Sequence, residues 1–134
     1  MKFVLAPDSF KNCMRAPEVA AELARGIREA APEAKIVEIP LSDGGEGFAA
    51  AAAAAGGGRL EYLDTVDPLG RPIRAGYARF TPEATVWLEL AAAAGLELLS
   101  RRERAPLTAS TYGFGRMTAE LLKQGCRKFV LGLG

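Results

Sequence analysis

Two short stretches of this sequence carry residue types that ligand chemistry uses. In APDSFKNCM, Asp8, Ser9 and Lys11 directly follow an apolar run. In LSDGGEGF, Asp43 and Glu46 stand among glycines. Carboxylates can accept a proton or hold Mg²⁺, a lysine can neutralise phosphate oxygens, and glycines let the backbone approach a ligand closely. These residue types favour the binding of Mg²⁺ and of phosphate groups.

The surrounding pattern predicts that each stretch follows a strand of one parallel sheet. The apolar runs 2–6 and 35–40 predict strands, the first of them buried on both faces. Between them, apolar residues at helical spacing follow Pro17, and Pro32 ends this predicted helix. A strand, a helix and a strand within forty residues form a βαβ unit with parallel strands and a right-handed crossover.

The carboxyl ends of parallel strands meet at one edge of a sheet, where ligands bind. We therefore expect Asp8, Asp43 and Glu46 to converge there, with Lys11 beside them. A helix after the second stretch would offer free backbone amides to an anion. Structural interpretations stay open beside this one: a turn at Asp8 and Ser9, a solvated Lys11, and a helix cap at Asp43 and Glu46.

After these two stretches, the sequence pattern predicts a different set of elements. Seven alanines predict a helix over 49–55 that packs close to a sheet and ends at a run of glycines. Three extended segments then predict an antiparallel meander: 59–66, 71–80 and 84–90. A helix and a final buried strand are predicted at 112–124 and 128–134. We place a domain boundary between 1–58, the start of one lobe, and 59–134, part of a second lobe.

A strand that leads into Gly-Leu-Gly should feed a loop and a helix in an α/β protein, so we expect the 134 residues to be a fragment. The formal net charge of +1 excludes a global field that would attract nucleic acid or an anionic membrane. The sequence holds no histidine, which removes imidazole chemistry. Cys13 and Cys126, without a secretory signal, predict reduced thiols in the cytoplasm, and a buried position is favoured for Cys126.

Two further patterns have competing interpretations. GEGFAA matches the dinucleotide fingerprint at Gly45, Gly47 and Ala50, although the neighbouring carboxylates would repel a pyrophosphate. TASTYGFGRM is a hydroxyl-rich and glycine-rich turn before a helix, suited either to capping by Ser110 or Thr111 or to ligand contact. The single tryptophan is expected in the core.

A set of motifs in this order closely resembles the start of the bacterial glycerate kinases. The motifs are KFVLAPDSFKNCMRAPEVAAELARGI, IPLSDGGEGF, VDPLGRPI, LELAAAAGLELL, TYGFG and KFVLGLG. The resemblance is collinear over all 134 residues. It implies two α/β lobes, one of them flavodoxin-like or Rossmann-like, with this chain holding roughly a third of the enzyme.

The implied reaction is the phosphorylation of glycerate by ATP to 2-phosphoglycerate, with Mg²⁺ as the metal. The resemblance implies catalytic roles for Asp8, Lys11 and Asp43. It also implies that Asp8, Asp43 and Glu46 hold the Mg²⁺. It implies contacts with substrate or phosphate for the following residues: Ser9, Gly44, Gly45, Glu46, Gly47, Thr111, Gly113 and Gly115. The expected partners are glycerate and ATP, not nucleic acid or membrane.

The chain departs from the family's usual residues at a few positions: Asn12, Cys13, Phe48, Asp67, Phe114 and Arg116. Asn12 is a mild departure, because asparagine tolerates the left-handed conformation. Two other functions stay open: a homologue that binds a small anion without catalysis, and a dinucleotide-binding oxidoreductase fragment. We expect the isolated fragment to be inactive.

Overall fold

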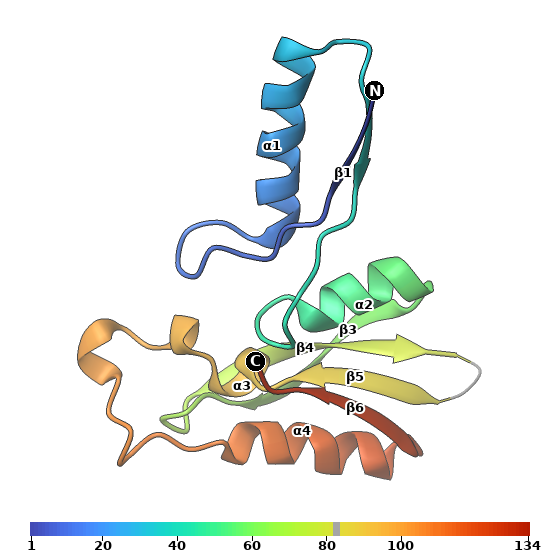
Figure 1. Cartoon of the computed structure of the whole chain (residues 1–134). Helices are drawn as coiled ribbons and strands as arrows, with labels where there is room; N and C mark the ends of the chain where they lie inside the picture. Colours follow the sequence, from blue (N-terminus) through green and yellow to red (C-terminus); the bar gives the residue numbers. More distant parts are fainter. Residues whose placement is uncertain (82–83) are drawn as a thin grey trace. The chain divides into compact units, whose positions relative to one another are not determined.

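The computed structural model describes residues 1–81 and 84–134 and shows a mixed α/β protein (Figure 1). The chain divides into two compact units, Met1–Asp43 and Gly44–Gly134. The domain boundary at residue 58 refers to lobes of a longer protein and stays a prediction. In the part of the chain that is described, no helix is long and apolar enough to cross a membrane.

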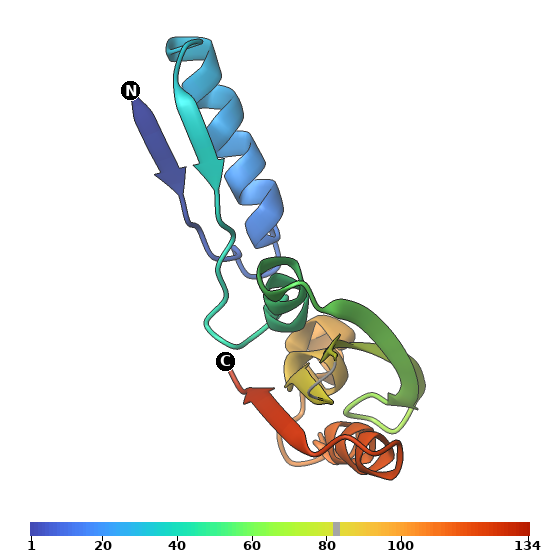
Figure 2. The same cartoon turned by 90° about the vertical axis from the view of Figure 1, so that its right-hand side faces the viewer.

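The first unit is the βαβ unit that the sequence predicts. Strands β1 (Lys2–Leu5) and β2 (Lys35–Glu38) pair in parallel, and helix α1 (Ala16–Ala30) connects them. Figure 2 shows the two strands side by side, with α1 running along them. The helix begins with a proline in its first turn and buries the small face formed by Val19, Ala20 and Ala24.

The prediction that β1 is buried on both faces is wrong for this chain. Alternate residues of β1 are exposed, and the Val4 side chain keeps 55% of its surface in solvent. The apolar run is typical of a central parallel strand. In the described residues of this unit, however, α1 is the only helix that packs on the two strands.

The second unit is a four-stranded sheet in the order β3-β4-β5-β6. Its strands are β3 (Arg59–Val66), β4 (Pro72–Phe80), β5 (Thr85–Glu89) and β6 (Lys128–Gly132). Its helices are α2 (Phe48–Gly56), α3 (Ala91–Ala94), η1 (Leu96–Leu98), η2 (Arg101–Glu103) and α4 (Tyr112–Lys123). The predicted meander is confirmed, since β3, β4 and β5 are antiparallel, and β6 joins β5 in parallel.

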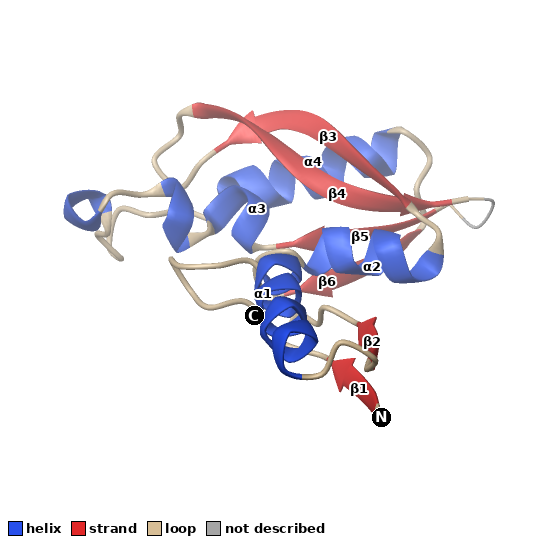
Figure 3. Cartoon of the chain, turned by 90° about the horizontal axis from the view of Figure 1, so that it is seen from above, coloured by secondary structure: helices blue, strands red, loops and turns tan. Residues whose placement is uncertain are grey.

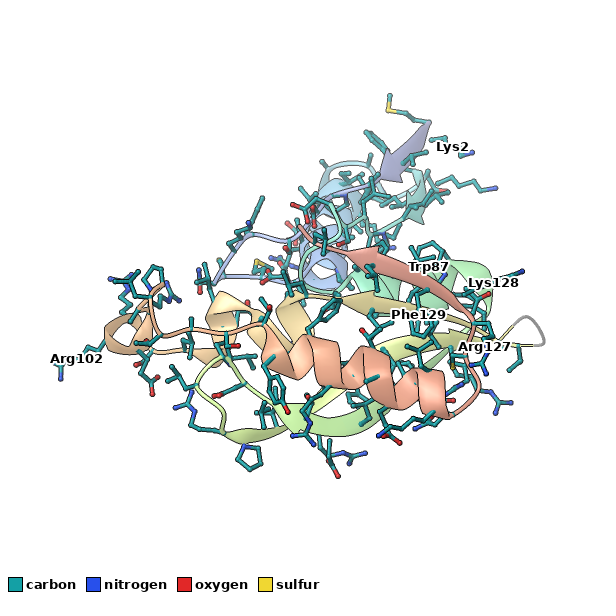
Figure 4. The ribbon with its side chains drawn as sticks, turned by 90° about the horizontal axis from the view of Figure 1, so that it is seen from below. Lys2, Trp87, Arg102, Arg127, Lys128 and Phe129 are labelled. Atoms are coloured by element: carbon teal, nitrogen blue, oxygen red, sulfur yellow. The ribbon has the colours of Figure 1, made fainter. Side chains whose placement is uncertain are left out.

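Helices cover both faces of this sheet (Figures 1 and 3). On one face, α4 packs Met117 and Leu121 against Val86 and Leu88 of β5 in the main core. Phe129 of β6 packs against the same cluster, and Figure 4 shows it beside α4. The apolar residues that recur on one face of α4 thus meet apolar residues of the strands and form one layer of the core.

On the other face, the alanines of α2 lie close to the sheet, as predicted. Ala49 and Ala53 are buried against Ala78 of β4. Small side chains allow this close approach, because they add little bulk between helix and sheet. Trp87 lies in the same cluster, with its ring centroid 5.8 Å from that of Phe80. The expectation of a core tryptophan is therefore confirmed.

A polar network fixes the far end of α4 to β3 and β4. The Arg79 guanidinium donates hydrogen bonds to Glu61 Oε2 at 2.8 Å, to Gln124 Oε1 at 3.0 Å and to Cys126 Sγ at 3.0 Å. The Tyr77 hydroxyl also donates to Glu61, at 2.6 Å. Cys126 is 1% exposed, as expected, whereas Cys13 is exposed.

Candidate active site

In the first unit, the two predicted motif loops lie side by side beyond the strands. The Ile39 amide bonds to the Leu5 carbonyl at 2.7 Å, and the Leu41 amide bonds to the Pro7 carbonyl at 2.9 Å. The parallel pairing of β1 and β2 therefore continues past the carboxyl ends of both strands. This continuation brings the loop that holds Asp8 next to the loop that ends in Asp43.

The Asp8 carboxylate joins these two loops. Its Oδ1 accepts the Ser9 amide at 2.6 Å, and its Oδ2 accepts the Asp43 amide at 3.1 Å. The predicted convergence of Asp8 and Asp43 is thus observed. The bond to Ser9 matches the alternative of a local turn, and the bond to Asp43 spans 35 residues and organises the edge of the sheet.

Lys11 stands on a tight turn, three residues after Asp8. The Phe10 and Met14 backbones bond to each other and close the turn, and Lys11 between them is exposed. Asn12 has a φ of 57°, in the left-handed region that its side chain tolerates. The departure at Asn12 is therefore accommodated without a glycine.

The DGGEG motif is shared between the two units, because Asp43 ends the first and Gly44 begins the second. Gly44 and Gly47 have φ values of 102° and 82°, which side chains other than glycine rarely adopt. The loop also lies against the end of β6, since a Cβ on Gly132 would be 2.4 Å from the Gly44 carbonyl oxygen. These glycines are required by backbone conformation and close packing.

Glu89, at the end of β5, is a site residue that the sequence analysis missed. Its Oε1 accepts the Gly47 amide at 3.1 Å, and its Oε2 accepts the Ala49 amide at 2.8 Å. Burial raises the pKa of Glu89, the nearby Glu46 adds to this, and the bonded amides partly oppose it. The available signal was an acid at the end of an apolar strand, followed by the small residues of α3.

The Glu89 contacts overturn one expectation. The amides of Gly47 and Ala49 at the start of α2 are not available to an external anion, because a carboxylate of the chain accepts them. A phosphate at this helix end would meet a like charge. The α2 start is thus fixed internally, and its first amides do not form an anion site.

The glycine-rich turn at the start of α4 is explained in part by packing against the sheet. Ser110 Oγ accepts the Tyr112 amide at 3.1 Å in a local turn, but Ser110 precedes the N-cap residue Thr111 and no side chain caps the helix, so the expected capping is wrong. A Cβ on Gly113 would lie 1.8 Å from the Val66 carbonyl oxygen, so this glycine is required by packing against β3. Gly115 is exposed and a Cβ there would meet nothing within 4 Å.

Topology places the glycine-rich turns of the second unit at one edge of its sheet. Strands β3, β5 and β6 run in the same direction, because β4 is antiparallel to both β3 and β5, and β6 is parallel to β5. Gly113 lies at the carboxyl end of β3, and Glu89 and Gly132 lie at the ends of β5 and β6. This is the edge at which open α/β sheets bind ligands.

Two departures from the family pattern are explained by packing. The Phe48 ring centroid lies 5.2 Å from that of Trp87, and a Cβ on Gly132 would lie 2.5 Å from the Phe48 ring. Phe114 is partly buried against the main core. Arg116 lines a groove of about 590 Å³ between β3 and α4. Nothing in the structure explains Arg116 itself.

The described residues contain no group of three acidic or cysteine side chains that could hold a metal. Asp8 and Asp43 belong to the first unit and Glu46 to the second, so the three-carboxylate Mg²⁺ site stays a prediction. Each Asp8 oxygen accepts one amide hydrogen and keeps a lone pair. Asp8 therefore fits the usual Mg²⁺ arrangement of one or two carboxylates with phosphates and water.

A sequence model described as "Glycerate kinase family" matches residues 3–134. The chain belongs to the glycerate kinase family. Similar members are "Glycerate 2-kinase" of Escherichia coli K12, 37% identical over 134 residues, and "Glycerate kinase" of Bacillus subtilis 168, 36% identical. Both alignments cover all of this chain and 35% of the relative, so the chain spans about a third of their length.

A solved structure of the glycerate kinase family supports the fold. The crystal structure of a protein from Salmonella typhimurium LT2, described as a glycerate kinase 2, is similar to this chain with a TM-score of 0.70. Its sequence is 36% identical, and the match covers all of this chain and 36% of that one. The mixed α/β fold class predicted for this family member is confirmed.

Proposed function

We propose that the protein containing this chain transfers a phosphoryl group from ATP to glycerate and forms 2-phosphoglycerate. The observation that carries the proposal is the bond between the Asp43 amide and the Asp8 carboxylate. It joins the two motifs by which the chain resembles glycerate kinases, at a sheet edge suited to ligand binding. Membership of the family over residues 3–134 supports it independently.

In this proposal, the two aspartates have different roles. Asp8 holds the two loops together through its amide bonds, which suits it to positioning. Asp43 is exposed, which suits its carboxylate to accept the proton of the substrate hydroxyl. Exposed Lys11 would neutralise a phosphate or the glycerate carboxylate. Phosphoryl transfer depends mainly on such positioning and charge stabilisation.

The proposal includes ATP as donor and Mg²⁺ as its metal. Bound Mg²⁺ supplies charge neutralisation at the phosphate oxygens, and Asp8, Asp43 or Glu46 would hold it. The residues that remain proposed contacts of substrate or phosphate are Ser9, Gly44, Gly45, Glu46, Thr111, Gly113 and Gly115. The amide of Gly47 is no longer proposed as a phosphate contact, because it is bonded to Glu89. A cytoplasmic location, expected from the two thiols, belongs to the same proposal.

Phosphorus NMR of the complete protein with Mg·ATP and glycerate tests the reaction. We expect a new phosphomonoester signal together with ADP, and its coupling pattern identifies the phosphorylated hydroxyl. An unchanged ATP spectrum from folded protein would refute the proposed function. Calorimetric binding of glycerate or ATP without turnover would then favour an anion-binding homologue. The dinucleotide alternative loses support, because Glu89 occupies the helix end where a pyrophosphate would bind.

Substitutions test the proposed roles. Asp43→Asn and Lys11→Ala should each lower kcat by at least about 100-fold, the scale of lost proton transfer or preorganised charge. Asp64→Asn and Lys123→Ala are matched controls, because both side chains are exposed on the second unit outside the motif turns. Near-normal turnover in the Asp43 and Lys11 variants would exclude these residues from the reaction.

A further inference from the structure

The carboxylate of Glu89 connects two elements that carry the second half of the DGGEG motif. Glu89 is the last residue of β5, and the amides that it accepts belong to Gly47 and Ala49, on either side of Phe48. A carboxylate offers both oxygens as acceptors, so one side chain fixes the end of the loop and the first turn of α2 together.

Backbone conformation and packing also bear on the two ends of this loop. Gly44 packs against the end of β6 at one end of the loop, in a left-handed conformation. Gly47, at the other end, is also left-handed and has no side chain to anchor it. The start of α2 has no side-chain cap of its own, and the bonds to Glu89 take the place of one.

We propose that Glu89 is a positioning residue of the phosphoryl transfer, which holds the Gly44–Gly47 segment in the conformation that the reaction needs. The inference rests on the proposed function. Glu89 is 42 residues from Gly47 in the sequence and its carboxylate bonds to the chain's own amides, so it acts on the loop and not on a ligand. Displacement of a reacting group by about 1 Å can lower a rate about 100-fold.

Burial of the carboxylate is consistent with a functional role. Burial raises the pKa of this side chain, so the fold disfavours its charged form. A neutral side chain would avoid this desolvation. A charged acid is therefore disfavoured at this position by burial. We attribute its presence to the two amide bonds by which Glu89 holds the loop.

Glu89→Gln in the complete protein tests the inference. Glutamine keeps the length of the side chain but replaces one acceptor oxygen with a donor, so only one of the two amides keeps its partner. Glu103→Gln is the matched control. Glu103 Oε2 also accepts a backbone amide, that of Ser100, at 2.8 Å, but it lies on η2, outside the motif loops.

Two readouts are measured on each variant. We expect Glu89→Gln to increase hydrogen exchange in the peptide 44–55 and to lower kcat by about 10- to 100-fold, with KM for glycerate changed less than about threefold. Glu103→Gln should change neither. Glu89→Asp, which keeps the charge on a shorter side chain, should give an intermediate kcat, and it replaces the glutamine variant if that one does not fold.

The outcomes separate the possible failures. Unchanged exchange in 44–55 would overturn the role of Glu89 in holding the loop. Increased exchange with unchanged kcat would show a purely structural cap and would also overturn the inference. A complete wild-type protein that does not phosphorylate glycerate would refute the proposed function instead, and the exchange comparison would still decide whether Glu89 holds the loop.

Discussion

Two glycines of the same turn should respond to alanine in opposite directions. At Gly113, an added Cβ would lie 1.8 Å from the Val66 carbonyl oxygen, whereas distances under 3.0 Å are essentially never found. The start of α4 must therefore move by at least about 1.2 Å. This shift would also disrupt the buried hydrogen bond of 2.6 Å from the Thr65 hydroxyl to the Gly113 carbonyl.

The magnitudes can be worked from these contacts. Overpacking costs about 1–3 kcal/mol and the lost hydrogen bond about 1 kcal/mol, and alanine returns up to about 1 kcal/mol of helix propensity. Gly113→Ala should therefore lower the free energy of unfolding by about 2 kcal/mol. Gly115→Ala meets no neighbouring atom and should raise it by about 0.5–1 kcal/mol.

Urea denaturation followed by the fluorescence of Trp87, the only tryptophan of the chain, measures both values. With a slope of about 2 kcal/mol per molar urea, the two midpoints should differ by about 1–2 M. Equal midpoints would refute the assignment of Gly113 to packing. If Gly115→Ala is more stable but the complete protein loses turnover, Gly115 is a ligand contact, as the family resemblance implies.

Glu61 and Glu89 should affect the stability of the fold with opposite pH dependences. The Tyr77 hydroxyl and then Arg79 lower the pKa of Glu61 below its ordinary 4.5, so its contribution to stability is present above that value and is lost as the pH falls through the lower pKa. Glu61→Gln should thus lower the melting temperature at pH 7 and much less at pH 3, and a pH-independent difference would contradict this. Burial raises the pKa of Glu89, so wild type should lose stability relative to Glu89→Gln as the pH rises from 4.5 through the raised value. Melting curves in the same buffers measure this, and a difference that moves the other way would contradict it.

Local periodicity was sufficient to predict most of the elements. Strand β3 has the predicted bounds, and α1 begins one residue before the predicted Pro17, because apolar spacing and proline act within a few residues. Helix α3 and the two 3₁₀ turns after it were not predicted. They have three or four residues each, and α3 depends on packing against β4 and α4, which local sequence does not encode.

Some residues of the candidate site could also be predicted from the sequence, and others could not. Asp8 and Asp43 could be predicted to meet, because parallel strands bring their carboxyl ends together. Glu89 could not, because its acceptor role depends on amides 40 and 42 residues away across the sheet. Gly113 was expected to contact ligand or phosphate, and its packing against Val66 appears only when β3 and α4 are placed together.

The contrast between the two thiols gives the chain its own pair of chemical probes. Cys13 is exposed and should be accessible to an alkylating reagent in the folded protein. Cys126 is enclosed beneath Arg79 and should react only when the end of α4 separates from the sheet. The ratio of the Cys126 labelling rate to the Cys13 labelling rate would therefore report how often the end of α4 separates from the sheet. The Cys13 rate, measured in the same molecule, corrects for the reagent concentration.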